Sequence, residues 1–108
     1  MEDSRLMRSM LLDFYGQLLT EKQRECYDLH YNEDLSLSEI AEQSGISRQG
    51  VWDNIRRADA ALRELEEKTG LVGRVMELER ELERARAELR QLQAAGAGDA
   101  ARGARDGI

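Results

Sequence analysis

Apolar residues recur at steps of three and four along most of the chain, which is the spacing of one face of an α-helix. The first 18 residues carry the first such stripe, made of Met7, Met10, Leu11, Phe14 and Leu18. We expect these side chains to pack in a helix that ends near Gly16, with the methionines filling irregular gaps in the core. The stripes that follow have the same period, so the sequence predicts an all-α fold.

Two capping boxes mark the starts of the next two helices. Residues 20–23, Thr-Glu-Lys-Gln, place a hydroxyl three positions before a glutamine and predict a helix over residues 21–31. Residues 36–39, Ser-Leu-Ser-Glu, have the same form, and Gly45 closes the helix that they begin. The second box therefore starts a short helix that ends in a sharp turn.

A longer helix follows this turn. Ser47 can cap it, and its buried side is predicted to carry Val51, Ile55, Ala58 and Leu62. Two helices joined by a short turn that contains glycine form the helix-turn-helix signature, whose second helix presents its first exposed residues to a groove or a partner. The candidate contact residues for nucleic acid or a partner are Ser47, Arg48, Gln49, Trp52, Arg56 and Arg57.

Charge argues against an ordinary reader of duplex DNA. The chain has 108 residues and a formal net charge of −6, and residues 20–70 contain seven basic residues against twelve acidic ones. DNA binding draws most of its affinity from Lys and Arg that neutralise phosphates. Arg48, Arg56 and Arg57 still outnumber the aspartates on the predicted second helix of the motif. They form either a small basic patch or merely a solvated helix face.

Residues 11–71 resemble the YlxM family of small bacterial proteins, whose helix-turn-helix is similar to region 4 of sigma factors. The most specific matching segments are Asp13 to Gly16, Leu19-Thr20 with Lys22-Gln23, Leu37 to Ala41, Ser47 to Gln49, Val51, and Asp53 to Ile55. The family's genes usually neighbour that of the GTPase of the signal recognition particle. The resemblance therefore implies association with that particle, through its GTPase or its RNA, and it brings no catalytic residue to this chain.

The exposed positions of the motif depart from a promoter reader. Sigma-like modules are rich in Lys and Arg there, whereas this chain has Trp52, Asp53 and Asn54. An exposed Trp52 suits a protein contact or an unpaired RNA base as well as duplex DNA, and partial burial against the first helix is the alternative for it. Gly50 stands where the resemblance leads us to expect alanine. It weakens the helix by about 1 kcal/mol unless a partner backbone approaches closely.

Candidate chemistry is limited to one pair of side chains. Cys26 and His30 lie four residues apart on the helix predicted over residues 21–31, and they are the only cysteine and histidine. A zinc site would need carboxylates for its remaining ligands, and Cys26 shares an apolar stripe with Leu29, where thiols are usually inert. With no phosphate-binding loop and no nucleophile motif, we expect no metal, no cofactor and no enzymatic activity.

Three features bear on location. No run approaches the roughly 18 consecutive apolar residues that a membrane helix needs, so we expect no membrane insertion. Glu2 and Asp3 stand where a secretory signal would carry basic residues. The single cysteine cannot form an intramolecular disulfide, which fits a reducing compartment. We expect a cytoplasmic protein.

A heptad seam occupies the last third of the chain. Its apolar positions alternate at steps of four and three residues: Leu71, Val75, Leu78, Leu82, Ala85, Leu89 and Leu92. A seam this narrow favours a second helix as its cover, so we expect a homodimer, with packing back onto the preceding domain as the alternative. With Leu71 assigned to the first a position of the heptad, the flanking charges favour an antiparallel pair. The small, polar, aperiodic sequence after Ala95 predicts disorder.

The sequence thus predicts a helix-turn-helix domain over residues 1–70, a coiled-coil-like helix over residues 71–95 and a disordered tail over residues 96–108. We expect a non-enzymatic binding module that regulates or forms part of the bacterial signal recognition particle pathway. A DNA-binding transcriptional regulator and a structural coiled-coil adaptor are the alternatives.

Overall fold

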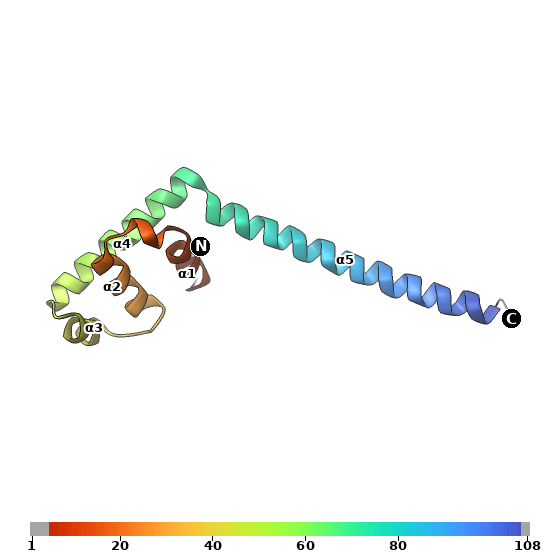
Figure 1. The fold of residues 1–108 in the computed structure, drawn as a ribbon, viewed down its shortest axis with the longest axis horizontal. Helices are drawn as coiled ribbons and strands as arrows, with labels where there is room; N and C mark the ends of the chain where they lie inside the picture. Colours follow the sequence, from red (N-terminus) through yellow and green to blue (C-terminus); the bar gives the residue numbers. More distant parts are fainter. Residues whose placement is uncertain (1–4, 107–108) are drawn as a thin grey trace. The chain divides into compact units, whose positions relative to one another are not determined.

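The computed structural model describes residues 5–106, with side chains described as far as residue 97. This part of the chain contains no strand, which confirms the all-α class. Its elements are α1 (Arg5–Tyr15), the 3₁₀ helix η1 (Gly16–Leu18), α2 (Glu21–Tyr31), α3 (Leu37–Ser44), α4 (Arg48–Thr69) and α5 (Leu71–Asp106) (Figure 1). They divide into two compact units, Met1–Gly73 and Arg74–Ile108, called here the N-terminal and C-terminal units.

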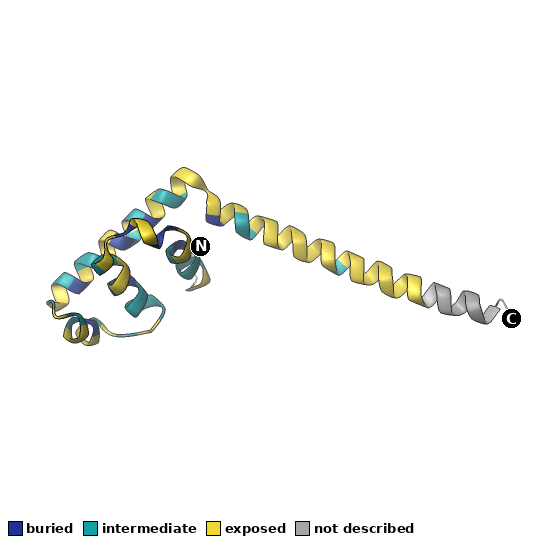
Figure 2. Cartoon of the chain, viewed as in Figure 1, coloured by how far each residue is buried: buried dark blue, intermediate teal, exposed yellow. Residues whose placement is uncertain are grey.

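Helix α4 organises the N-terminal unit, because α1, α2 and α3 all pack against it. Its predicted buried side is confirmed, since all four of its members are at most 1% exposed. Figure 2 shows these buried positions on the side of α4 that faces the other helices of the unit. The described core comprises Leu11, Tyr15, Leu19, Cys26, Tyr27, Ile40, Val51, Ile55, Ala58, Leu62 and Val72.

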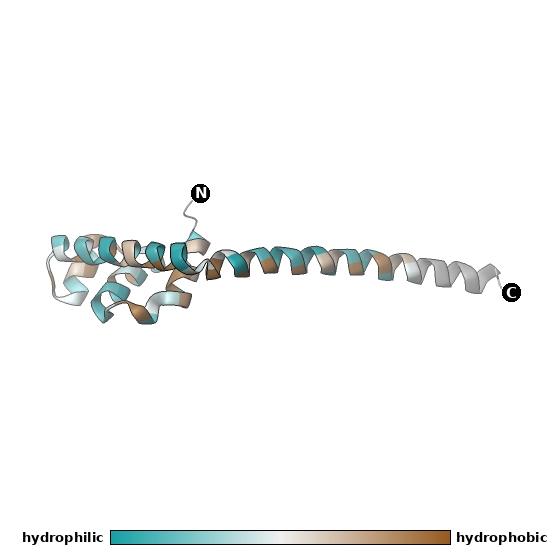
Figure 3. Ribbon diagram, turned by 90° about the horizontal axis from the view of Figure 1, so that it is seen from above, coloured by the Kyte–Doolittle hydropathy of each residue, from teal (hydrophilic) through white to brown (hydrophobic). Residues whose placement is uncertain are grey.

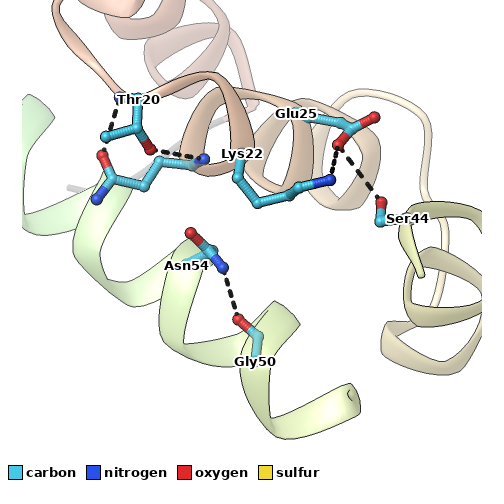
Figure 4. A network of polar contacts seen from close by, with 7 residues as sticks. Thr20, Lys22, Glu25, Ser44, Gly50 and Asn54 are labelled. Atoms are coloured by element: carbon cyan, nitrogen blue, oxygen red, sulfur yellow. Dashed lines mark hydrogen bonds and ion pairs between the residues drawn. The ribbon is translucent and has the colours of Figure 1, made fainter. Parts of the chain in front are cut away.

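Both predicted capping boxes are present. The Thr20 hydroxyl accepts a hydrogen bond from the Gln23 N–H at 3.2 Å, and the Gln23 side chain accepts one from the Thr20 N–H at 3.2 Å (Figure 4). In the second box the Ser36 hydroxyl accepts a hydrogen bond from the Glu39 N–H at 3.1 Å, and the Glu39 carboxylate accepts one from the Ser36 N–H at 2.8 Å. Each box supplies two of the N–H groups at a helix start with acceptors, which is why α2 and α3 begin where the sequence predicts.

The predicted core stripe of the first helix is partly wrong. Leu11 is buried, but Phe14 is 42% exposed and Leu18 is 69% exposed, while Tyr15 and Leu19 are buried instead. Helix α1 ends at Tyr15 and the chain continues as the tighter 3₁₀ turn η1. A 3₁₀ turn has about three residues per turn rather than 3.6, so the phase of the stripe changes and Leu18 leaves the core face.

Glu66 joins three segments of the N-terminal unit. One of its carboxylate oxygens accepts hydrogen bonds from the Tyr15 hydroxyl at 2.6 Å and the Val72 N–H at 3.0 Å, and the other accepts one from the Gly73 N–H at 2.9 Å. Burial alone would raise the pKa of Glu66, but these three hydrogen bonds outweigh it and lower the pKa. Because Val72 is also fully buried, the compact unit extends three residues beyond the predicted boundary at Gly70, where α4 ends in a left-handed cap.

The described part of the C-terminal unit is the continuation of one helix, α5, whose first three residues belong to the N-terminal unit. The sequence predicted that this helix would stop near Ala95, but α5 continues to Asp106. No proline interrupts the segment, and the high helix propensity of its alanines opposes the cost of its glycines. Disorder of the tail in solution stays a prediction, and residues 107–108 lie outside the described part.

The predicted seam lies on the surface of α5. Among its members Leu78, Leu82, Leu89 and Leu92 are 45%, 49%, 53% and 69% exposed. Figure 3 shows apolar positions recurring along one side of this helix. In the described part of the chain, no helix is both long enough and apolar enough to cross a membrane.

Candidate nucleic-acid interface

The turn between α3 and α4 fixes the candidate interface. Gly45 ends α3 with φ of 69°, a left-handed conformation that glycine adopts without steric cost. Two residues later the Ser47 hydroxyl accepts a hydrogen bond from the Gly50 N–H at 2.9 Å and caps α4. The chain therefore has the helix, short turn and helix of a helix-turn-helix, with the start of α4 at the surface.

All six predicted contact residues are exposed. They come from the cap and first three turns of α4, and they alternate along the chain with the buried Val51 and Ile55. Trp52 is 39% exposed, so part of its indole surface is open to solvent. The structure therefore places all six at the solvent-exposed start of α4, called here the α4 surface, and their contact with a partner stays a prediction.

Asp53, which the sequence places among the exposed positions of the motif, was not counted among the six contact residues. It accepts hydrogen bonds from Arg56 at 3.0 Å and from Gln49 at 3.2 Å. The hydrogen bond from Arg56 is the largest cause of a lowered pKa of Asp53, and Gln49 and the charges of Arg56 and Arg57 add to it. The spacing of three and four residues is the sequence signal for these contacts.

The positive charge of the surface is consequently uneven. Asp53 forms an ion pair with Arg56, whereas neither Arg48 nor Arg57 forms an ion pair with any residue that the structure describes. The N–H groups of these two guanidinium groups are therefore available to donate hydrogen bonds to a ligand. A guanidinium that is not already paired has more to gain from a phosphate or a carboxylate, so we rank Arg48 and Arg57 above Arg56.

Gly50 has a local explanation in the structure. A Cβ atom on this residue would lie 3.2 Å from the Ser47 hydroxyl oxygen, which is the oxygen that caps α4. The Gly50 carbonyl also accepts a hydrogen bond from the Asn54 side chain at 2.9 Å (Figure 4). Glycine at this position leaves room around the Ser47 cap. The close approach of a partner backbone is therefore not needed to explain the glycine.

The Cys26 and His30 pair has a structural role. Cys26 is fully buried, and burial is the main cause that raises the pKa of its thiol, followed by the charge of Glu25. The His30 ring contacts the Leu35 carbonyl oxygen at 3.0 Å and stacks edge-on against Tyr31. The part of the chain that the structure describes holds no cluster of three His, Cys, Asp or Glu side chains suited to a metal ion.

A shallow polar groove lies beside α1, η1 and α2. Asp13, Glu21, Glu25 and Asp28 line it together with only two basic side chains, Lys22 and Arg24. Lys22 already forms an ion pair with Glu25, which in turn accepts a hydrogen bond from Ser44 of α3 (Figure 4). The acidic balance disfavours a phosphate backbone in this groove, so the α4 surface is the better candidate for nucleic acid.

The fold and this surface define a small helix-turn-helix protein. A family model described as "Putative helix-turn-helix protein, YlxM / p13 like" (UPF0122) matches residues 2–95. The chain belongs to this family, as the matching segments in its sequence led us to expect.

Several curated relatives carry the same family name. A UPF0122 protein of Thermoanaerobacter sp. (strain X514) is 49% identical over 84 residues, which cover 78% of this chain and 72% of the relative. One from Acetivibrio thermocellus is 58% identical over 69 residues, covering 64% of this chain and 59% of the relative. One from Halalkalibacterium halodurans is 51% identical over 74 residues, covering 68% of each.

Proposed function

We propose that this protein is a non-enzymatic binding module of the bacterial signal recognition particle pathway, which it regulates or of which it forms part. The α4 surface contacts the RNA of the particle or its GTPase. The link to this pathway rests on the resemblance to the YlxM family, and the helix-turn-helix family supports nucleic-acid binding more broadly. A cytoplasmic location follows from the proposed role.

One observation carries the assignment to the α4 surface. Arg48 and Arg57 have no described ion-pair partner, and Trp52 of the same helix is 39% exposed. Guanidinium groups bind phosphates, and an indole ring stacks on unpaired bases. Few other cations support this surface, which suits a folded RNA with accessible bases better than a long duplex.

The test measures binding of the full chain to three labelled ligands: the RNA of the particle, an unrelated structured RNA of equal length, and duplex DNA. We expect tighter binding to the RNA of the particle, with the affinity falling as salt rises. Arg56→Glu together with Arg57→Glu should weaken binding without unfolding the protein. Arg80→Glu together with Arg84→Glu, two exposed positions on α5, is the charge-matched control.

Single substitutions sharpen this test. Arg57→Gln should weaken RNA binding more than Arg56→Gln does, because Asp53 already pairs with Arg56. Loss of one phosphate contact should also lower the slope of log affinity against log salt by about 0.7 to 0.9. Equal affinity of all variants for the RNA would remove α4 from the interface.

Two other functions give different results. A DNA-binding transcriptional regulator, which the helix-turn-helix fold supports, should prefer a specific duplex. A coiled-coil adaptor, which the exposed seam on α5 supports, should bind none of the three ligands. If the GTPase is the partner, a nuclease-treated lysate should still yield it with the wild-type chain and not with the Arg56→Glu, Arg57→Glu variant.

A further inference from the structure

The exposed seam on α5 indicates what covers it once its heptad positions are assigned correctly. In a heptad the step from a to d is three residues and the step from d to a is four. The seam begins with a step of four, from Leu71 to Val75, and then takes a step of three to Leu78. Leu71 is therefore a d position, and its assignment to a, on which the expected antiparallel pair rested, is wrong.

The corrected assignment changes which side chains flank the seam. The a positions are Val75, Leu82 and Leu89, and the d positions are Leu71, Leu78, Ala85 and Leu92. The charged residues at the flanking g positions are Arg74, Glu81 and Glu88, and those at the e positions are Glu79 and Arg86. These are the residues that meet across a two-stranded coil.

We propose that α5 pairs with α5 of a second copy of this chain, as a parallel, in-register two-stranded coiled coil over residues 71–92. In such a pair each g residue faces the e residue five positions later on the partner. Glu81 then faces Arg86 of the other copy, and Arg74 faces Glu79. Both contacts join opposite charges, and each occurs twice in the dimer.

The antiparallel pair that keeps all positions from Val75 to Leu92 in contact is less favourable. It sets e against e and g against g, so that Glu79 faces Arg86 but Glu81 faces Glu88. Half of its flanking contacts are therefore repulsive. Charge complementarity selects the parallel orientation, and Val75 at the first a position with Leu71 and Leu78 at d is a combination that favours two strands.

Ion pairs within α5 agree with this interpretation. Glu83 and Arg90, both at b positions, pair with each other at 3.1 Å, away from the seam. Glu79, Glu81 and Arg86 form no ion pair with any other residue that the structure describes, so their charges remain available for a partner helix. Arg74 is shared, because it also pairs with Glu77 of its own helix. The contact between Glu81 and Arg86 therefore contributes more to the choice of orientation.

Sedimentation equilibrium of the full chain at low salt tests whether α5 pairs with a second copy of the chain. We expect a dimer, and we expect Leu82→Glu to give a monomer whose Trp52 fluorescence matches that of the wild type, which shows that the N-terminal unit is intact. A wild-type chain that remains monomeric across the accessible concentrations would overturn the proposal. So would a dimer that Leu82→Glu leaves unchanged.

The orientation is tested by Glu81→Arg, whose effect has opposite signs for the two arrangements. In the parallel pair it faces Arg86 and should raise the dimer dissociation constant about tenfold, since two attractive contacts become two repulsive ones. In the antiparallel pair it faces Glu88 and should lower that constant, which would refute the parallel assignment. Adding Arg86→Glu should restore dimerisation. Glu83→Arg is the matched control, because it makes the same change on the outer side of α5 and should leave the constant unchanged.

A cross-link gives an independent result. In Leu92→Cys the two new thiols are adjacent in the parallel pair, whereas in the antiparallel pair each lies opposite Val75, so that the thiols are about 25 Å apart. Mild oxidation should yield a covalent dimer only in the parallel case, and the buried Cys26 of the wild type provides the background control. Failure of the covalent dimer to form from a non-covalent one would overturn the in-register parallel arrangement.

Discussion

Glu66→Gln tests the hydrogen-bond network that joins the first residues of α5 to α1 and α4 within the N-terminal unit. The amide oxygen can take over the bonds from Tyr15 and Val72, but the amide nitrogen would face the Gly73 N–H, donor against donor. The variant thus loses one hydrogen bond and the charge that strengthens the other two. Hydrogen bonds to a charged group contribute about 1.5–3 kcal/mol when buried, and Glu66 is only half-buried. We expect a loss of about 1–2 kcal/mol.

The dependence on pH identifies the carboxylate as the cause. The pKa of Glu66 is lowered in the folded protein from its ordinary value of 4.5. Its stabilisation is therefore fully present above the unfolded pKa and is lost as the pH falls through the folded one. The difference in stability between wild type and Glu66→Gln should be largest near neutral pH and should shrink as the pH falls below that ordinary value.

Urea denaturation followed by Trp52 fluorescence measures this difference, because the only tryptophan lies in the N-terminal unit. Protein concentration is held constant, since dimerisation would shift the midpoint. Glu67→Gln is the control: its carboxylate is exposed and forms no hydrogen bond with another described residue. The reasoning fails if Glu66→Gln matches the wild type, or if the difference is the same at every pH.

Three further substitutions have expected outcomes. Cys26→Ser should lower the free energy of unfolding by roughly 1–3 kcal/mol, because it places a hydroxyl in a fully buried site, and metal analysis should give the same content before and after. Tyr27→Phe should leave stability unchanged or raise it, because the buried Tyr27 hydroxyl has no described hydrogen-bond partner; a loss above about 1 kcal/mol in urea denaturation would contradict this. Gly45→Ala should lower the thermal midpoint, at a cost of roughly 1 kcal/mol, because φ of 69° is strained for alanine.

Local signals in the sequence were sufficient to predict the helix starts. The Thr20 and Ser36 capping boxes and the left-handed Gly45 depend on residues within four positions of one another, and the structure contains all three. The buried side of α4 could be predicted equally well, because its four members recur with the period of a helix. The exposure of the six candidate contact residues was predictable in the same way, since none of them belongs to that buried set.

Features that depend on distant residues escaped prediction. The sequence does not show that α1 gives way to a 3₁₀ turn, so Leu18 was placed in the core. Phe14 and Tyr15 are neighbours at the end of α1, and periodicity alone did not show that Tyr15 is the buried one. Glu66 resembles any surface glutamate until Tyr15, 51 positions earlier, is brought against it. The ion pair between Asp53 and Arg56 could have been predicted, because the two residues are three positions apart on a helix. It would have altered the ranking of the arginines.

The Glu66 network also bears on how α5 folds. Starting a helix is the unfavourable step, because several residues must be ordered before the first hydrogen bond is gained. Here the carboxylate of Glu66 holds the Val72 and Gly73 N–H groups, and the buried Val72 side chain fixes the same turn. The folded N-terminal unit thereby supplies a ready nucleus, from which α5 needs only to propagate. A peptide that begins at residue 74 lacks this nucleus, so its helicity should be lower than that of the same residues in the full chain.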